Sequence, residues 1–309
     1  MYKLRKTLVR AWVGLIGVHE CSFGLALLSV PRRRADYMGR ETELTTRFAA
    51  ADDASRPDLM EITRRLAVAL FIACIPIFLI ATNVRWVISA PILYSYGFDK
   101  YDIPRRTGIE RHELLSAGRQ IRDYFSNGEE YLTVSVVRFG QPVPGLYNSR
   151  EVLHMKDVKF LVKGVYRLQE ISGTYLLLFA AVGLWFRRRS FLPQLGYYGV
   201  LGAAITLAVV VLAGLASIVG FDQVFLAFHQ IIFTNDLWQL DPRTDMLLIM
   251  FPQGFFLDAT LWIAGSTILE ALIVVTASAA LMGKERRGSA LLAVRRLVGV
   301  AGPEPTGLA

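Results

Sequence analysis

Hydrophobic residues in this chain gather in long, nearly uninterrupted blocks. A helix needs about 20 apolar residues to cross the hydrocarbon core of a bilayer. Four blocks meet this requirement, at residues 66–88, 165–186, 197–221 and 259–282. Because unpaired backbone polar groups are costly in lipid, these blocks are predicted to be helices. The pattern therefore predicts a mainly α, polytopic membrane protein with four transmembrane helices.

Short basic clusters orient the predicted helices in the membrane. They are Arg64 and Arg65, Arg187 to Arg189, and Lys284 with Arg286 and Arg287. In a four-helix topology all three clusters fall on one side, which the positive-inside rule makes cytoplasmic. The C-terminal tail, residues 283–309, is then cytoplasmic, and the loops 89–164 and 222–258 are extracytoplasmic.

The first outer loop, residues 89–164, is long enough to form a small α/β subdomain. Residues 111–125 have the apolar spacing of a helix. Residues 131–139 are rich in β-branched and aromatic residues and are predicted to form a strand. The Pro-Val-Pro-Gly sequence at 142–145 predicts a turn, and a second helix from 149 leads into the second span.

The second outer loop, residues 222–258, is unusually apolar. Its segments 224–238 and 246–256 are rich in Phe, Ile, Leu and Met, but each is too short to cross the membrane. Such runs indicate interfacial or re-entrant segments.

The first 65 residues are predicted to form a peripheral helix followed by a flexible linker. A span at residues 11–30 would place the basic residues 32–34 outside and contradict the orientation given by Arg64 and Arg65. Hydropathy alone leaves such a fifth span open as the alternative. No signal peptide is expected, because charged residues interrupt the apolar stretch and no cleavage site is evident.

Composition limits the function classes. Of the 309 residues 53% are hydrophobic, and the formal net charge is +8. Much of the positive charge lies beside apolar blocks, which indicates contact with an anionic leaflet and not with nucleic acid. The two cysteines, Cys21 and Cys74, lie in apolar surroundings, so neither a disulfide nor a zinc site is predicted.

Two histidines, His154 and His229, lie in outer segments next to predicted spans. Neutral imidazole accepts a proton near pH 7, and two imidazoles that face one pocket would support proton transfer. Asp157 and Glu151 each lie three residues from His154, on the same helix face, where a carboxylate would fix the imidazole tautomer. The alternatives are a solvated helix face around His154 and a purely structural His229.

Other polar residues accompany the histidines. Asn235 is a candidate hydrogen-bond donor to a developing oxyanion. Trp238 is a candidate to lie at the level of the lipid headgroups, and Asp241 begins a predicted turn. Glu270, the one acid in the fourth span, is either functional or paired with a neighbouring helix. A metal held by His154, Asp157 and His229 is the weaker alternative, and no metal or cofactor is expected.

Three strings together resemble the Lit family of bacterial lipoprotein intramolecular transacylases. They are Arg150-Glu-Val-Leu-His-Met-Lys-Asp-Val-Lys159, Phe228-His-Gln-Ile-Ile-Phe-Thr-Asn-Asp-Leu-Trp-Gln-Leu-Asp241 and Leu248-Ile-Met-Phe-Pro-Gln-Gly-Phe-Phe256. The resemblance covers residues 66–282. Residues 1–65 have no counterpart in the pattern, and Gln253 stands where an acid would be expected.

The resemblance implies four spans, an outer insertion after the first, and an extracytoplasmic site in the bacterial plasma membrane. It implies as substrate a lipoprotein whose N-terminal cysteine carries a diacylglyceryl thioether. One acyl chain would move from the glyceryl sn-2 ester to the α-amino group of the same cysteine. His154 and His229 would be the catalytic pair. Which of them is the base stays open, the partners are this lipoprotein and membrane lipids, and no oligomeric state is assigned.

Two other functions remain as alternatives. One is another extracytoplasmic lipid ester hydrolase or acyltransferase in which water or a different amine replaces the α-amino group. No Gly-x-Ser-x-Gly motif supports a serine nucleophile for such an enzyme. The other is a non-catalytic membrane assembly or binding protein in which the histidines only pack.

Overall fold

The computed structural model describes residues 59–282 of the chain. The predicted peripheral helix and linker up to residue 58, the alternative span at 11–30 and the tail 283–309 lie outside the described residues. The chain divides into two compact units, Met1–Leu70 and Phe71–Ala309. The candidate site and its surroundings belong to the second unit.

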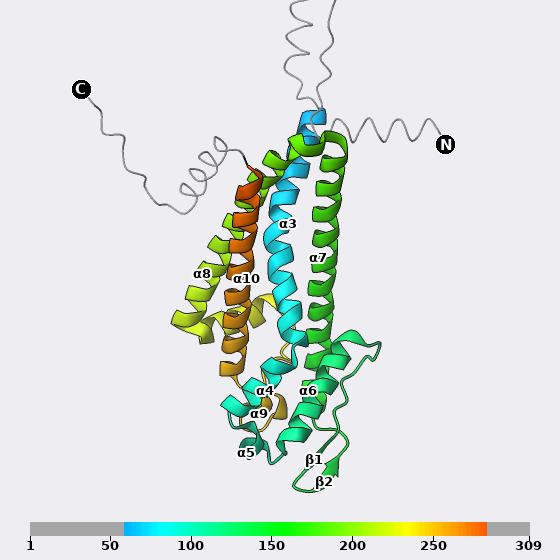
Figure 1. Cartoon of the computed structure of the whole chain (residues 1–309). Coiled ribbons are helices and arrows are strands. Elements are labelled where there is room, and N and C mark those ends of the chain that lie inside the picture. Colours follow the sequence, from blue (N-terminus) through cyan, green and yellow to red (C-terminus); the bar gives the residue numbers. More distant parts are fainter. Residues whose placement is uncertain (1–58, 283–309) are drawn as a thin grey trace, which may run out of the picture. The chain divides into compact units, whose positions relative to one another are not determined.

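The described residues are mainly helical, as the apolar blocks predict. The long helices are α3 (Leu59–Ser89), α7 (Ser149–Arg187), α8 (Leu192–Ile232) and α10 (Gln253–Leu281). Three stretches in the described part of the chain are long and apolar enough to cross a membrane: Leu59–Ser89, Ser149–Ile232 and Gln253–Leu281. The middle stretch combines α7 and α8, which meet at the short 3-10 helix η1 (Arg188–Phe191), where the chain reverses (Figure 1).

Small residues allow α8 and α10 to approach closely. A Cβ atom on Gly196 would lie 2.5 Å from the backbone oxygen of Ser278, and one on Gly199 would lie 2.2 Å from the Ser278 hydroxyl. Ala203 on the same helix is completely buried. Packing of this kind stabilises helix pairs in membranes, where apolar burial alone does not favour association.

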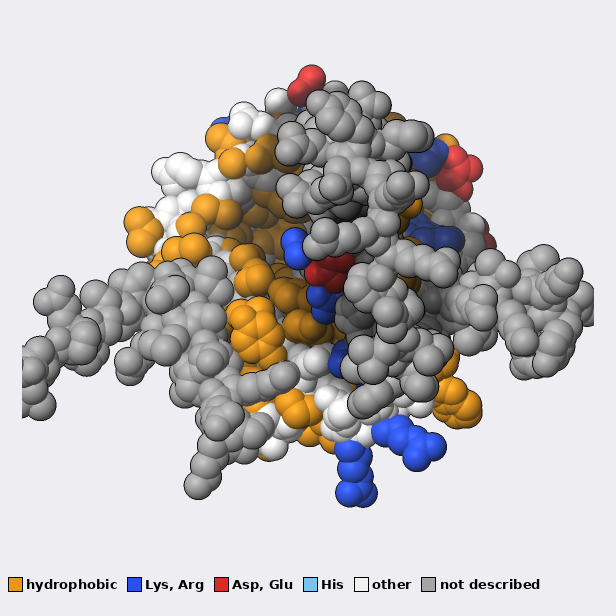
Figure 2. All heavy atoms as spheres, turned by 90° about the horizontal axis from the view of Figure 1, so that it is seen from above, with side chains coloured by type: hydrophobic (Ala, Val, Ile, Leu, Met, Phe, Trp, Pro, Cys, Tyr) orange, Lys and Arg blue, Asp and Glu red, His pale blue; other side chains and the backbone are white. Residues whose placement is uncertain are grey.

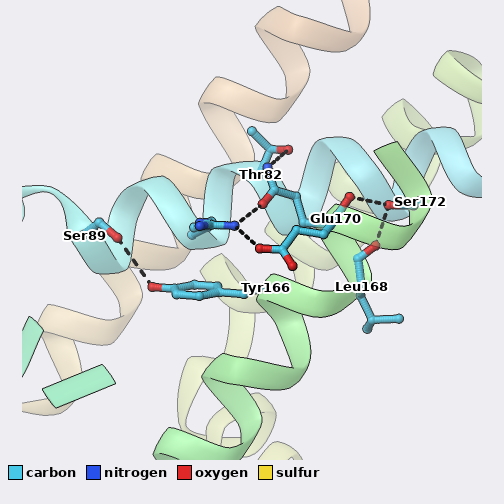
Figure 3. Close-up of polar contacts among 8 residues, drawn as sticks. Thr82, Ser89, Tyr166, Leu168, Glu170 and Ser172 are labelled. Carbon is cyan, nitrogen blue, oxygen red and sulfur yellow. Dashed lines mark hydrogen bonds and ion pairs between the residues drawn. The ribbon is translucent and has the colours of Figure 1, made fainter. Parts of the chain in front are cut away.

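Polar side chains join the C-terminal part of α3 to the middle of α7 (Figure 3). Arg85 Nη1 donates hydrogen bonds to Gln169 at 2.8 Å and to Glu170 at 3.0 Å. Its guanidinium group lies 4.5 Å from the centre of the Tyr166 ring. These contacts fix α7 against α3 at the level where the apolar stretches of both helices end.

Glu270 has a partner on a neighbouring helix. Its Oε2 accepts a hydrogen bond of 2.6 Å from Asn83 Nδ2 on α3. The same amide also donates to the backbone oxygen of Leu79. Of the two interpretations of this acid, the contact supports pairing between helices.

The region between α3 and α7 contains α4 (Pro91–Lys100), α5 (Ile103–Thr107) and α6 (Arg111–Ser126). The predicted helix at 111–125 is confirmed by α6. Helices α4 and α5 were not predicted from the sequence. The apolar core of this region is shared with α9 (Met246–Met250), since Phe98, Ile103, Leu114 and Met250 are all fully buried in one cluster.

The predicted strand at 131–139 is largely wrong. Only β1 (Val136–Arg138) is a strand, and it pairs antiparallel with β2 (Gln141–Val143), where a turn was expected. The actual turn is at Phe139 and Gly140, both with positive φ, which is the conformation of a two-residue hairpin loop.

Ser135, directly before β1, satisfies its backbone through a side chain, whereas the carbonyl of Val134 accepts a hydrogen bond from the N–H of Leu146. The amide of Gln120 donates to the Ser135 carbonyl, and its carbonyl accepts from the Ser135 N–H. At Ser135, a side chain on α6 thus takes the place of a neighbouring strand.

Helix α7 runs without interruption from the predicted outer helix into the predicted second span. It begins with a capping box, in which the Asn148 side chain accepts from the backbone N–H of Glu151 and the Glu151 side chain accepts from that of Asn148.

The apolar outer loop also differs from the expectation. Helix α8 continues past its apolar block to Ile232, with non-helical angles at Gly220 (φ −155°, ψ 63°). Beyond Gly220 the chain runs crosswise to the long helices before it reaches α9 (Figure 1). The segment 224–238 is thus helical to Ile232 and irregular after it, and α10 starts at Gln253, earlier than the predicted 259.

Hydrophobic side chains form much of the coloured surface in Figure 2, and Lys and Arg side chains lie in the middle of this face, at its lower edge and at its right side. Arg188 and Arg189, between α7 and α8, are exposed. Exposed apolar residues on α8 such as Leu212 and Leu215 are expected of a helix that faces lipid.

Candidate active site

The first turns of α7 position His154. Glu151 is almost completely buried, with 1% of its surface exposed, and it joins α7 to α9 by accepting a hydrogen bond from Leu247 N. Arg150 donates to the backbone oxygen of Asp236, and Asn148 donates to Asp245. The polar start of α7 is therefore attached to the loop between α8 and α9 by several hydrogen bonds.

His229 lies on the helical segment that follows the kink at Gly220. Its Nδ1 is 2.7 Å from the backbone oxygen of Phe225, one turn earlier. A carbonyl oxygen only accepts hydrogen bonds, so Nδ1 carries the proton when the ring is neutral. The lone pair of neutral His229 is therefore on Nε2.

The structure brings the two imidazoles together. The centres of the His154 and His229 rings are 6.4 Å apart, and the Phe233 ring lies 5.2 Å from the first and 5.6 Å from the second. Only 7% of His154 and 9% of His229 is exposed. Both line a cavity of about 540 Å³, together with Phe225, Trp238, Asp241 and Phe256.

Burial keeps both rings neutral. His154 lies before the apolar part of α7, and His229 lies after that of α8. Burial, with a smaller effect of His229, lowers the pKa of His154 to about 4, although Asp157 opposes the shift. Burial also lowers the pKa of His229, against the opposing effect of the Phe225 carbonyl. A neutral imidazole can accept a proton on one nitrogen and donate a hydrogen bond from the other.

The carboxylates expected to orient His154 have other partners. Asp157 Oδ2 accepts a 2.9 Å hydrogen bond from Asn235 Nδ2. Glu151 binds the N-terminus of α7 and the N–H of Leu247. The Nδ1 of His154 is buried and has no hydrogen-bond partner among residues 59–282. In this structure both carboxylates hold the loop around the site, and neither fixes the imidazole tautomer.

The other predicted residues lie around the same cavity. The Trp238 ring is 5.3 Å from that of His229. Asp241 lines the cavity and forms the expected turn, accepting hydrogen bonds from Arg243 and, at its backbone, from Thr244. Asn235 is occupied by Asp157 and by the N–H of Leu237, so its amide is not directed at a reacting oxygen.

Two contributors were not predicted from the sequence. Phe225 orients His229 through its carbonyl, and Gln230 lines the cavity beside it. The spacing of four residues between Phe225 and His229 would have indicated the contact, had the helix been predicted to continue beyond residue 221.

Comparisons with known proteins identify a family match and similar folds. The sequence model of the family described as lipoprotein intramolecular transacylase Lit matches residues 69–256. A relative from Aquifex aeolicus (strain VF5), described as an uncharacterized protein, is 25% identical over 202 residues, which cover 61% of this chain and 84% of the relative.

Solved structures of the Bacillus cereus membrane integral lipoprotein intramolecular transacylase Lit have a similar fold at 19% sequence identity. One aligns with a TM-score of 0.57 over 72% of this chain and 97% of the other. A variant with a histidine replaced by arginine aligns with a TM-score of 0.58 over 81% and 99%. At this identity the likeness concerns the fold alone.

Proposed function

Because this chain belongs to the Lit family of lipoprotein intramolecular transacylases, we propose that it catalyses acyl transfer within one lipoprotein molecule. The substrate carries a diacylglyceryl thioether on its N-terminal cysteine. The acyl chain of the glyceryl sn-2 ester moves to the α-amino group of that cysteine. The product is an N-acylated, S-monoacylated lipoprotein.

The observation that carries the proposal is the pair of buried imidazoles on one cavity, His154 and His229. The cavity wall is otherwise rich in aromatic and aliphatic side chains, which suits the acyl chains of a lipid substrate. Loss of the free α-amino group from a purified diacylated lipopeptide, without release of fatty acid, is the test of the proposed reaction.

His229 is the general base in this proposal. Its protonated Nδ1 is held by the Phe225 carbonyl, which leaves Nε2 as the proton acceptor. As the amine attacks the ester carbonyl, the new N–C bond makes the nitrogen acidic, and Nε2 takes the proton. The same imidazolium then gives this proton to the glyceryl oxygen as the C–O bond breaks. The proton count is therefore balanced without a second acid.

His154 stabilises the oxyanion in this proposal. It stays neutral because burial lowers its pKa to about 4, so it acts by donating an N–H hydrogen bond and not by releasing a proton. A neutral imidazole is suited to polarise a carbonyl because it carries no charge that must be desolvated. Removal of one such donor typically costs about 10²–10³ in rate.

The substrate supplies both reacting groups. The amine and the ester belong to one molecule. When the site holds them in contact, the entropic cost of bringing them together is met on binding and no longer adds to the reaction barrier. Replacement of an ester by an amide is favourable, so the reaction needs no cofactor or external energy source.

The membrane topology is part of the proposal. Counted separately, α7 and α8 bring the number of spans to four, since the chain reverses at η1 between them (Figure 1). The exposed Arg188 and Arg189 at this reversal favour a cytoplasmic location for it. The histidines then lie on the extracytoplasmic side of the bacterial plasma membrane, and the C-terminus is cytoplasmic.

The pH dependence follows from the lowered pKa values. Burial lowers the pKa of His154 to about 4 and also lowers that of His229, so both imidazoles are neutral at neutral pH and are protonated only below the usual histidine range. The reference pKa of an α-amino group is about 7.7–8.0. We therefore expect kcat/KM to rise with pH up to about 8, as the substrate amine loses its proton, with no step near the usual histidine pKa of about 6.5. A profile of initial rates in detergent or nanodiscs measures this, and a single rise centred near 6.5 would contradict the assignment.

A further inference from the structure

The helical segment 221–232 after the Gly220 kink has two different flanks. Phe225, Leu226, His229 and Gln230 line the cavity. The opposite flank consists of Val224, Phe228 and Ile231, which have 36%, 50% and 80% of their surface exposed. We call these three residues the apolar flank. Three large exposed side chains along one face of a helix require an explanation in a folded protein.

The kink occurs where the apolar stretch is long enough to have crossed the bilayer. Residues 197–219 cover about 35 Å as a helix, against about 30 Å for the hydrocarbon core. Phe221 follows Gly220, and the exposed polar residues Asp222 and Gln223 come next. The chain then turns crosswise to the long helices, as the yellow part of α8 shows (Figure 1). The turn thus comes at about the length of helix that crosses the hydrocarbon core.

The apolar flank continues a lipid-facing surface. On the preceding part of α8, Leu212, Leu215, Ile218 and Val219 are all more than half exposed. Among residues 59–282, the Phe228 ring contacts no other aromatic ring than that of the adjacent His229. Apart from the two exposed polar residues at the kink, Asp222 and Gln223, the exposed apolar surface of α8 resumes at the apolar flank.

From these observations we propose that residues 221–232 form an interfacial helix whose apolar flank lies in the acyl chains of the nearer leaflet. Its other flank is a wall of the histidine cavity, so the helix separates the cavity from the hydrocarbon. The location of the helix does not depend on the proposed reaction.

Site-directed spin labelling tests the location. In protein with Cys21→Ser and Cys74→Ala, single cysteines at 224, 228 and 231 are labelled with a nitroxide and reconstituted in phospholipid nanodiscs. The matched controls are labels at 223 and 230 on the same helix. We expect the ratio of oxygen to nickel-chelate collision rates to be several-fold higher at the three apolar positions than at the two controls.

Equal ratios on both sides of the helix would overturn the proposal, because they would place the segment in water. Low access of both reagents to the apolar positions would also overturn it, because the flank would then be covered by protein. A second measurement avoids labels: in bromine-substituted lipid, the added fluorescence of Ile231→Trp should be quenched more than that of Gln223→Trp. Similar quenching of both would contradict the proposal.

Discussion

His229→Ala is expected to lower the rate of N-acylation by about 10²–10⁴-fold, the usual contribution of a general base. The Nδ1 of His229 donates a hydrogen bond to the Phe225 carbonyl, so the lone pair of the neutral ring is on Nε2. His229→Asn should not restore the rate, because a side-chain amide does not accept a proton near neutral pH. The measurement is single-turnover conversion of a purified diacylated lipopeptide.

His154 should respond differently to the same substitutions. His154→Ala removes the proposed oxyanion donor, whereas His154→Asn retains an N–H donor and should recover part of the lost rate. His112→Ala is the control, because His112 is exposed and lies beside Glu110 and Glu113, away from the cavity. Equal effects of alanine and asparagine at 154, or activity retained in His229→Ala, would contradict the assigned roles.

Glu151→Ala is expected to lower the free energy of unfolding by about 2–6 kcal/mol. The carboxylate is buried and accepts hydrogen bonds from the N–H groups of Asn148 and Leu247, so its loss leaves both donors without partners. Each unsatisfied buried donor costs about 1–3 kcal/mol. Thermal unfolding in detergent, followed by intrinsic fluorescence, measures the change.

Glu110→Ala provides the matched control for this substitution. Glu110 also precedes a helix, but it is exposed and makes no capping hydrogen bond to α6. Its replacement should change the melting temperature little. If Glu151→Ala unfolds at the same temperature as the control, the hydrogen bond between Glu151 on α7 and Leu247 on α9 contributes less to stability than the structure indicates.

The long helices were predictable because twenty consecutive apolar residues leave few alternatives in a membrane. Shorter elements were not. Helix α4 contains aromatic residues and Gly97, and a Cβ on that glycine would lie 2.3 Å from the Phe255 ring, so tertiary packing determines it. The strand predicted at 131–139 failed because Gln120 satisfies the backbone of Ser135, a contact that no local pattern reveals.

The site was predictable in part. The sequence identified His154 and His229 from their positions beside apolar blocks, and the structure places their rings on one cavity. The spacing of Asp157 from His154 predicted a carboxylate beside the imidazole. Spacing places both on one helix face but cannot show that Asn235, 78 residues away, takes the carboxylate instead.

The most direct measurement is tandem mass spectrometry of a diacylated lipopeptide before and after incubation with the purified protein. Transfer within one molecule leaves the total mass unchanged, blocks the α-amino group, and moves one acyl chain to fragments that contain the cysteine nitrogen. This is the result expected for a lipoprotein intramolecular transacylase. Loss of one acyl chain to water with a free amine, or an unaltered diacylated lipopeptide, would contradict it.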